Sequence, residues 1–372
     1  MTLPTSRPHG RRRLSVLAVV SAALVTYVAA PATAAPTAAR TVVRHAAAAP
    51  VRVRVAAPTA ARSHSSVPIS TNPLATRSFY ADRLTWAGAQ AAKAPTTDGR
   101  AAARLVAVPQ AKWIGPNDQK AWIADYVSRA TAARQLPMLV LYAVPGRDCG
   151  GYSARGLSTS ARYLAWVQMV RQAIAARPTS VIVEPDALAS GSCSGRAADT
   201  DARIAMIAGA VDVLTGDTST AVYLDAGHEW WMTADVAADR LVRAHVARAR
   251  GFSLNVSNFY TTGSEVAFGA KVVAGIRARV PSSAPHFVVD TSRNGDGPAP
   301  ARRLDWCNPA GRLLGRLPAA TTDGGVLDGV VWVKHPGESD GTCERSEPGS
   351  GQWFGSWATD IVSRSLTAGL LG

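Results

Sequence analysis

The chain has 372 residues and a formal net charge of +14. Ten arginines and no acidic residue lie before Phe79, so residues 79–372 carry a net charge of only +4. Binding of nucleic acid needs Lys and Arg clustered on a folded face, so this distribution excludes nucleic acid as the expected partner.

The first 35 residues have the pattern of a secretory signal peptide. Arginines at 11–13 precede an apolar run at 14–30, and small residues follow at 32–35. The apolar run is short for a bilayer span, and no later run reaches about 18 apolar residues. We therefore expect export from a bacterial cell, cleavage near Ala34 or Ala35 and no stable membrane association afterwards. The alternative is a retained N-terminal anchor.

Residues 36–78 consist mainly of Ala, Val, Pro, Ser, Thr and Arg, without an acidic residue or a sustained helical or strand period. This composition is typical of a disordered linker. Residues 79–372 are enough for one large domain.

Seven short apolar runs in that domain are bounded by turn residues and indicate buried strands. They span 105–108, 138–144, 181–183, 221–224, 252–256, 286–289 and 330–333. Helical periods lie between most of them. One places Tyr163, Trp166, Val167, Val170 and Ile174 on one face, and another Val266, Val273, Ile276 and Val280. We predict an α/β fold, a distorted seven-stranded parallel β/α barrel. Residues 295–325 show no helix and make it irregular; a doubly wound open sheet is the alternative.

Four cysteines in an exported chain predict two disulfides. Of the three connectivities we favour Cys149 with Cys193 and Cys307 with Cys343, because these pairs close the shorter loops. The alternative, a zinc site, lacks the C-x-x-C or H-x-x-x-H spacing that it needs. We expect no metal and no cofactor.

Polar or aromatic residues follow each apolar run. They are Gln110, Trp113, Arg147, Asp148, Glu184, Asp186, Asp225, His228, Ser257, Asn258, Asp290, Arg293, Lys334, Glu338 and Asp340. In a β/α barrel these positions gather at the C-terminal ends of the strands, on the rim where such barrels have their active sites. Any one Asp could be a helix cap, but so many acidic residues are hard to explain by capping alone.

Carboxylates beside surface aromatics suggest carbohydrate chemistry, because a sugar ring has an apolar face for stacking. Trp113, Trp230, Trp231 and Trp306 all fall on the predicted rim, although any single Trp could equally fill the core. Glycoside hydrolysis needs one protonated and one ionised carboxyl. Asp186 ends a buried strand, where desolvation would raise its pKa, and is our candidate acid.

Eight motifs carry a family resemblance over residues 79–372. They are PQAKW (109–113), PGRDC (145–149), VEPD (183–186), LDAGH (224–228), NVSN (255–258), DTSRNG (290–295), DWCN (305–308) and VKHPGESDG (333–341). In this order they resemble glycoside hydrolase family 6, the inverting cellulases. The resemblance implies a distorted barrel of seven strands and the same two disulfides. Residues 79–372 would then be a catalytic domain acting on cellulose or soluble β-glucan chains, and we expect a monomer.

The resemblance also implies roles for single residues. Asp186 matches the catalytic acid, and Asp148 the aspartate that raises the pKa of the acid and helps organise water. Asp340 matches the residue proposed as the base, and we place it second to Asp186 as a catalytic candidate. Tyr142 matches a tyrosine that favours distortion of the sugar ring. Trp113, Trp231 and Trp306 match the family's tryptophans that stack on sugar rings. The family's polar groups that hold glucosyl hydroxyls are matched by Asp225, His228, Asn258, Lys334 and Glu338.

One segment departs from the family pattern. The family places a water-positioning serine and then glycines after the Asp-Cys pair, where this chain has Ser153, Ala154, Arg155 and Gly156. Either Ser153 takes that role, or Ala154 occupies the serine's place and turnover is lowered. Arg155 in place of glycine would stiffen the loop.

The connections at 186–193 and 306–334 are short, so we predict an open cleft and internal cleavage, that is, a secreted endo-β-1,4-glucanase. Two rivals stay open. One is a carbohydrate-binding protein without turnover. The other is a metal-dependent hydrolase built on Asp225, His228, His335 and Asp340.

Overall fold

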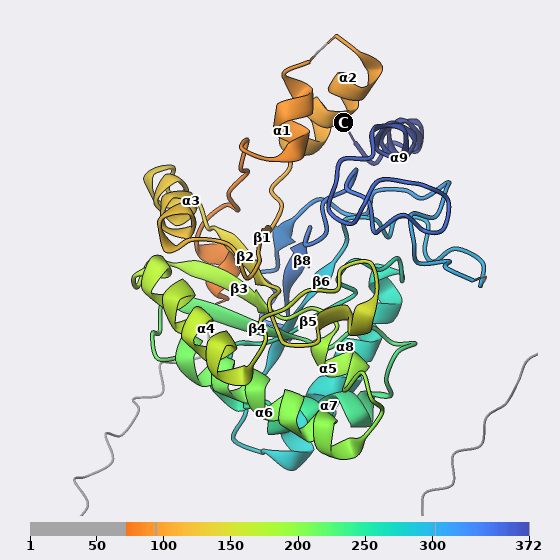
Figure 1. Cartoon of the computed structure of the whole chain (residues 1–372). Coiled ribbons are helices and arrows are strands. Elements are labelled where there is room, and N and C mark those ends of the chain that lie inside the picture. The colour runs from red at the N-terminus through yellow and green to blue at the C-terminus, as the bar shows by residue number, and fades with distance from the viewer. Residues whose placement is uncertain (1–71, 94, 302, 372) are drawn as a thin grey trace, which may run out of the picture. The chain divides into compact units, whose positions relative to one another are not determined.

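The computed structural model describes residues 72–93, 95–301 and 303–371 (Figure 1). The predicted signal peptide and most of the predicted linker lie outside the described residues. Within the described part, no helix combines the length and the apolar character needed to cross a membrane.

The folded domain includes residues 72–78, which the sequence assigned to the linker. A short 3₁₀-helix, η1 (Pro73–Thr76), buries Leu74 against the sheet. The side-chain amide of Asn72 donates to the carbonyls of Thr321 (2.9 Å) and Asp328 (2.6 Å). The predicted boundary at Phe79 is therefore too late, because one leucine and one asparagine anchor a segment whose composition resembles a linker.

A parallel-rich sheet of eight strands forms the centre of the domain (Figure 1). The strands are β1 (Lys112–Ile114), β2 (Met138–Leu141), β3 (Thr179–Val183), β4 (Thr220–Asp225), β5 (Gly251–Leu254), β6 (His286–Asp290), β7 (Ala319–Ala320) and β8 (Leu327–Val331). Their order is β1-β2-β3-β4-β5-β6-β8-β7, and only β7 is antiparallel to its neighbour. A doubly wound sheet needs a reversal of strand order, which is absent from the described strands.

The sheet curls toward the predicted barrel. The backbone N–H of Ala111, just before β1, donates to the carbonyl of Trp332, just after β8 (2.9 Å), so the segments that flank these two strands meet. The predicted count of seven strands is low by one, because β1 and β7 were missed and the run at 105–108 was counted although it is not a strand. β7 is only two residues long and has no period that the sequence could reveal.

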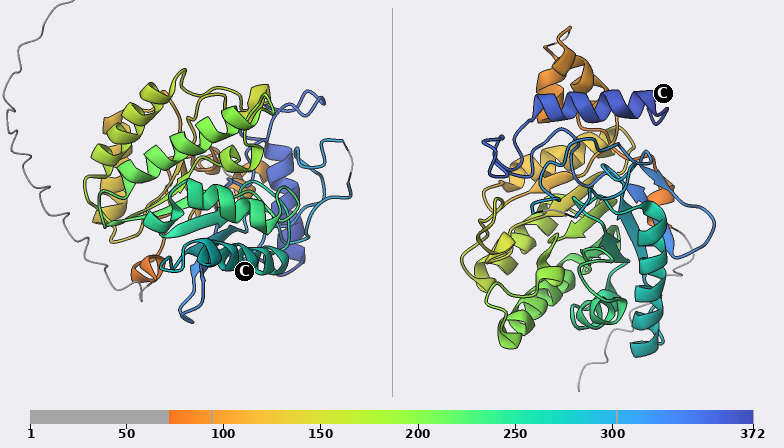
Figure 2. Two further views of the ribbon diagram at one scale, coloured as in Figure 1. Left: turned by 90° about the horizontal axis from the view of Figure 1, so that it is seen from below. Right: turned by 90° about the vertical axis from the view of Figure 1, so that its right-hand side faces the viewer.

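Helices lie along the outside of the sheet (Figures 1 and 2). They are α3 (Lys120–Ala132), α4 (Ser160–Ile174), α6 (Ala197–Leu214), α7 (Ala234–Arg243) and α8 (Thr262–Arg279), with short α5 (Ala187–Ser190), η2 (Arg147–Gly150) and η3 (Val246–Arg248) between elements. Both predicted helices are confirmed as α4 and α8. Hydroxyls of Thr159 and Thr261 cap them by accepting backbone N–H groups of the first turn.

One predicted strand is wrong. The apolar run at 105–108 begins in the last turn of α2 (Thr97–Val106). Leu105 and Val106 pack with Trp357 and Ile361 of α9 (Gly355–Thr367), beside α1 (Trp86–Ala91). Four apolar residues look alike at a buried helix end and in a buried strand. The true first strand, β1, begins with a lysine and shows no such run.

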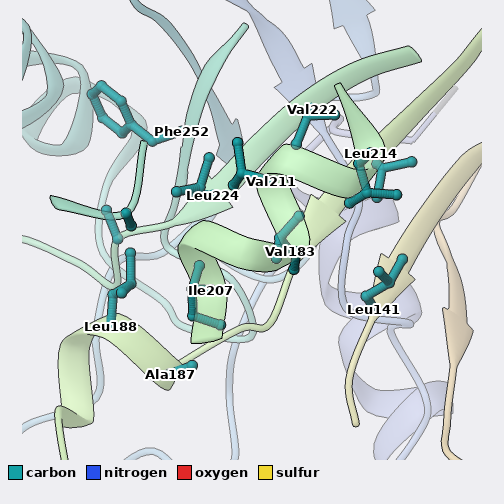
Figure 3. Close-up of a cluster of buried hydrophobic side chains, with 14 of the residues drawn as sticks. Leu141, Val183, Ala187, Leu188, Ile207, Val211, Leu214, Val222, Leu224 and Phe252 are labelled. Atoms are coloured by element: carbon teal, nitrogen blue, oxygen red, sulfur yellow. The ribbon is translucent and has the colours of Figure 1, made fainter. Parts of the chain in front are cut away.

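The strands alternate between two buried environments. Leu141 and Val183 face the outer helices and pack in the cluster drawn in Figure 3, where Ile207, Val211 and Leu214 of α6 contact the sheet. Leu139 belongs to the same buried cluster. Val140 and Ile182 point the other way, into a smaller cluster within the curl. Burial on both faces explains the continuous apolar runs and fixes where each strand ends.

Both predicted disulfides are confirmed. Cys149 pairs with Cys193 and Cys307 with Cys343, with Cα atoms 5.0 and 5.7 Å apart. Each bridge ties a loop that follows one strand to a loop that follows another. The segments beyond the strand ends are thereby held in place.

Candidate active site

A cleft of about 1170 Å³ lies at the carboxyl ends of the parallel strands. All the residues to which the family resemblance gave a catalytic or substrate-binding role, except Asp225, line it. They are Trp113, Tyr142, Asp148, Asp186, His228, Trp231, Asn258, Trp306, Lys334, Glu338 and Asp340. Most of the residues that follow the apolar runs therefore lie at this cleft, as the strand-end rule predicts, whereas Gln110, Glu184, Asp290 and Arg293 do not line it.

Asp186 occupies the turn between β3 and α5. Its backbone has a φ of 72°, in the left-handed region, and its N–H donates to Oδ2 of Asp225 (2.9 Å). Burial raises the pKa of Asp186 well above its usual range, the negative charges of Asp225 and Asp148 add to the rise, and a hydrogen bond with Tyr142 opposes it. A carboxyl whose pKa is raised holds its proton to higher pH, as a general acid must.

Asp225 does not contact the cleft, contrary to the predicted role in holding a sugar hydroxyl. It is the last residue of β4 and only 1% exposed. Its carboxyl accepts from the N–H groups of Asp186 (2.9 Å) and Gly227 (3.1 Å) and from the hydroxyl of Ser253 (3.0 Å). Burial raises its pKa to about 7. Asp225 therefore holds the backbone of Asp186 in place through this hydrogen bond and does not itself reach the cleft.

Asp148 lies on a tightly turned loop after β2. Asp148 and the next residue, Cys149, have φ values of 56° and 47°, and the disulfide to Cys193 holds the turn. Oδ2 of Asp148 accepts from the N–H of Ser153 (2.6 Å). Arg147 donates from Nε to the carbonyl of Ser153 (2.8 Å), and its guanidinium lies 4.2 Å from the ring centre of Tyr142. These contacts place the Asp148 carboxyl in the cleft.

The segment that departs from the family pattern touches a second loop of the cleft. The hydroxyl of Ser153 hydrogen-bonds to that of Ser350 (2.6 Å), and the ring of Tyr152 lies 6.1 Å from that of Trp306. Ala154 and Arg155 also line the cleft. The hydroxyl of Ser153 is thus engaged by another residue.

Asp340 is buried beside two cations. Its carboxyl accepts from Arg293 (2.8 and 3.0 Å) and from the N–H of Asn308 (3.1 Å), and Nζ of Lys334 lies 3.1 Å away. Burial alone would raise the pKa of Asp340, but Arg293 and Lys334 outweigh it and lower the pKa. Asp186 and Asp340 are therefore shifted in opposite directions within one cleft, the pattern of an acid and an ionised partner.

Aromatic rings supply the apolar part of the lining. Trp231 and Trp306 are 40% and 44% exposed, which leaves their faces free for stacking. Trp113 donates from Nε1 to the carbonyl of Val333 (2.8 Å) and meets the ring of Tyr142 edge-on. Trp230, also predicted for this rim, is 76% exposed and does not line the cleft.

Four polar groups complete the predicted lining. His228 stacks on Tyr260 at 4.3 Å, and burial lowers its pKa to about 4, so its ring is neutral. Asn258 donates to the carbonyl of Val256 (2.9 Å), and Lys334 donates to the carbonyl of Ser339 (3.1 Å). Glu338 lies 2.9 Å from Nδ1 of His335. Uncharged and charged polar groups thus line the cleft together with the aromatic rings.

Several lining residues were missed by the strand-end rule. They are Leu84, Thr85, Trp86, Lys112, Trp122, Tyr152, Tyr260 and Gln352, among others. Trp86 and Trp122 lie in α1 and α3 and are 55% and 41% exposed. Nothing in their local pattern separates them from tryptophans of an amphipathic helix. They reach the cleft because of how the helices pack.

The residues of the metal-dependent alternative are engaged elsewhere. Asp225 accepts three internal donors and Asp340 pairs with Arg293. Both ring nitrogens of His335 have partners, Glu338 (2.9 Å) and the carbonyl of Ala111 (2.6 Å). The geometry does not support a joint metal site of these residues.

Comparison with known proteins decides the family. The model of glycosyl hydrolases family 6 matches residues 69–365. The chain belongs to glycoside hydrolase family 6. The resemblance drawn from the motifs is thus confirmed, and the match includes residues 72–78, which the sequence had assigned to the linker.

Members of family 6 named endoglucanases are similar over most of this chain. Endoglucanase A of Cellulomonas fimi is 41% identical over 295 residues, which are 78% of this chain and 62% of that protein. The chain thus spans less than two thirds of this relative. Endoglucanase 1 of Streptomyces halstedii is 39% identical over 298 residues, 78% of this chain and 89% of that protein.

A solved structure of the family has the same fold. The endoglucanase Cel6 from Mycobacterium tuberculosis, in complex with methyl-cellobiosyl-4-deoxy-4-thio-β-D-cellobioside, is 41% identical, with a TM-score of 0.74. The alignment covers 79% of this chain and 99% of that one. Cellobiohydrolases of family 6 are also similar. The 1,4-β-D-glucan cellobiohydrolase CEL6B of Podospora anserina is 29% identical over 296 residues, 67% of this chain and 68% of that protein.

Proposed function

We propose that this family 6 enzyme is an exported endo-β-1,4-glucanase that cleaves internal bonds of cellulose or soluble β-glucans with inversion. One observation carries the proposal. Two carboxyl groups of a single cleft, Asp186 and Asp340, have pKa values shifted in opposite directions, one by burial and the other by two cations. Inverting glycoside hydrolysis needs one protonated and one ionised carboxyl.

In the proposed mechanism Asp186 donates its proton to the leaving glycosidic oxygen. Burial, then the charges of Asp225 and Asp148, raise the pKa of Asp186. Asp148 also helps to orient the water. Asp340 stays ionised and assists removal of the proton of the attacking water, which approaches the opposite face of the sugar. Tyr142, fixed between Trp113 and Arg147, presses on the sugar ring at the cleavage point and favours its distortion.

The lining suits a neutral polysaccharide. Faces of Trp113, Trp231 and Trp306 would stack on glucosyl rings. His228, Asn258, Lys334 and Glu338 would hold their hydroxyls. Stacking rings and polar groups of this kind suit the cello-oligosaccharide analogue named for the Mycobacterium tuberculosis structure.

Internal cleavage is favoured by the relatives. Those named endoglucanases are 41% and 39% identical, whereas the cellobiohydrolase from Podospora anserina is 29% identical. The connection that follows Asp186 is also short, since Cys193 already pairs with Cys149. Signal cleavage near residue 35, a linker before the domain and a monomeric enzyme complete the proposal.

Reducing ends and viscosity of carboxymethylcellulose test the activity and its mode. We expect viscosity to fall much faster than reducing ends appear, as internal cuts require. Reducing ends without a fall in viscosity would contradict the endo mode, and binding without release of sugar would favour the binding protein without turnover.

Stereochemistry is tested separately. Inversion of a β-1,4 bond gives the α-anomer, so proton NMR during the first minutes of cellotetraose hydrolysis should show the α-anomer before mutarotation. Appearance of the β-anomer first would contradict inversion.

The departure after Cys149 gives a prediction of its own. Because the hydroxyl of Ser153 is engaged by Ser350, it is poorly placed to hold the hydrolytic water. We expect Ala154→Ser to raise kcat on carboxymethylcellulose roughly threefold to tenfold, an effect of about one hydrogen bond, with little change in KM. Ser350→Ala, which frees the Ser153 hydroxyl, is the matched control. An unchanged kcat in both variants would show that neither serine position limits turnover.

A further inference from the structure

The short turn His228–Trp231 presents two lining residues of the cleft, and three of its backbone N–H groups donate hydrogen bonds. The N–H of Trp231 donates to the carbonyl of His228 (3.0 Å), and the N–H of Trp230 donates to Nδ1 of His228 (3.3 Å). The N–H of Glu229 donates to Oε1 of Glu265 (3.2 Å). Of these three acceptors, only Glu265 belongs to another element, the first turn of α8.

We propose that Glu265 is a positioning residue that fixes this turn and thereby the placement of Trp231 and His228 for glucan binding. The inference rests on the proposed function. The hydrogen bond from the N–H of Glu229 is partly buried, so loss of the Glu265 side chain would remove the acceptor that ties this turn to α8 and would loosen the turn. His228 and Trp231, whose rings lie 5.4 Å apart, would then shift together.

The environment of Glu265 makes this support sensitive to pH. The residue is fully buried, and Oε2 has no hydrogen-bond partner among the described residues. Burial, with the charges of Glu229 and Asp225, raises its pKa to about 8, although the N–H of Glu229 opposes the rise. Nearby titratable groups include His228, which is neutral, and Tyr260, whose own pKa is raised by burial and then by the charges of Asp305, Glu265 and Glu229. Lys271 of α8 lines a small hollow together with Glu229.

Ionisation would place a buried negative charge beside Glu229 and Asp225, with the N–H of Glu229 as the donor to Oε1 and none to Oε2 among the described residues. A buried charge with so little compensation is costly, so the turn would open to admit water. Above about pH 8 we therefore expect the wild-type enzyme to bind glucan more weakly through this residue. Binding, not the rate, is the proper measurement, because Asp186 also titrates and controls the rate.

The experiment measures the Kd of methyl-cellobiosyl-4-deoxy-4-thio-β-D-cellobioside, a thio-linked probe, by calorimetry from pH 5 to 9.5. Glu265→Ala should raise the Kd about tenfold at pH 6, with kcat on carboxymethylcellulose changed less than twofold. Glu265→Gln keeps an acceptor and cannot ionise. Its Kd should equal that of the wild type at pH 6, whereas by pH 9 the wild-type Kd should be several-fold higher.

Glu229→Gln is the matched control. It keeps the backbone N–H and removes a charge that raises the pKa of Glu265, so the weakening should begin at a lower pH than in the wild type. Equal Kd values for wild type and Glu265→Gln across the whole pH range would overturn the inference, and this comparison holds even if Glu265→Ala fails to fold. Wild-type protein that neither binds the probe nor cleaves any β-glucan would overturn the proposed function as well.

Discussion

Replacement of Asp186 by Asn is expected to lower kcat on unactivated β-glucan by about a thousandfold or more, because general acid catalysis of a poor leaving group is lost. Binding of cello-oligosaccharides should change by less than about threefold, since the side chain acts in the transition state. Asn is preferable to Ala, because residue 186 has a φ of 72°, a conformation that Asn tolerates better. Single-turnover kinetics and calorimetry measure the two effects.

The same variant should be more stable than the wild type at neutral pH. The folded state raises the pKa of Asp186, so above the unfolded value of about 3.9 folding must keep a proton that the unfolded chain releases. This cost grows as pH rises toward the folded pKa and disappears below about pH 4. Thermal unfolding of wild type and Asp186→Asn at pH 3.5 and pH 7 measures it.

Two results would contradict the role of Asp186. One is turnover close to the wild-type rate. The other is equal stability of both proteins at pH 7, which would show that the carboxyl is ionised in the folded enzyme. A substrate with an activated phenolate leaving group is the matched control, because it needs less protonation and should lose much less rate.

Much of the site was predictable because parallel strands buried on both faces produce continuous apolar runs, and the residues after them meet at one rim. Asp148, Asp186, His228 and Asp340 were placed in this way. Asp225 shows the limit of the rule. A polar side chain at a strand end can point into the cleft or be buried beneath it. Which of the two occurs depends on the backbone conformation at the strand end, and the hydrophobic periodicity of the sequence does not reveal that conformation.

The remaining errors have a similar origin. The run at 105–108 looked like a strand because burial in a helix–helix contact selects the same residue types. Trp86 and Trp122 reach the cleft through helix packing, and Glu265 acts through a single hydrogen bond to a distant turn. Contacts between segments far apart in sequence leave no local signal, so they had to be found in the structure.

Replacement of Arg293 by Met is expected to destabilise the folded state by about 3–5 kcal/mol at pH 7, because it removes one partner of a buried ion pair. Arg293 is fully buried and donates to both oxygens of Asp340. It lowers the pKa of that carboxyl, so the stabilisation is present above the unfolded value of about 3.9 and is lost as pH falls through the folded pKa. The difference between wild type and variant should therefore shrink below about pH 4.

The double variant Arg293→Met/Asp340→Asn separates charge pairing from packing. If pairing dominates, removing both charges should restore much of the stability lost in Arg293→Met alone, as measured by urea unfolding. Arg303→Met is the control, since Arg303 forms a mostly exposed pair with Glu344 and should change stability little. Equal losses in the single and double variants would instead assign the role of Arg293 to its packing over Phe259, 4.4 Å from the ring centre. Lys334 would then be the main group that keeps Asp340 ionised. In that case the pH at which activity falls on the acidic side would be the same in Arg293→Met as in the wild type.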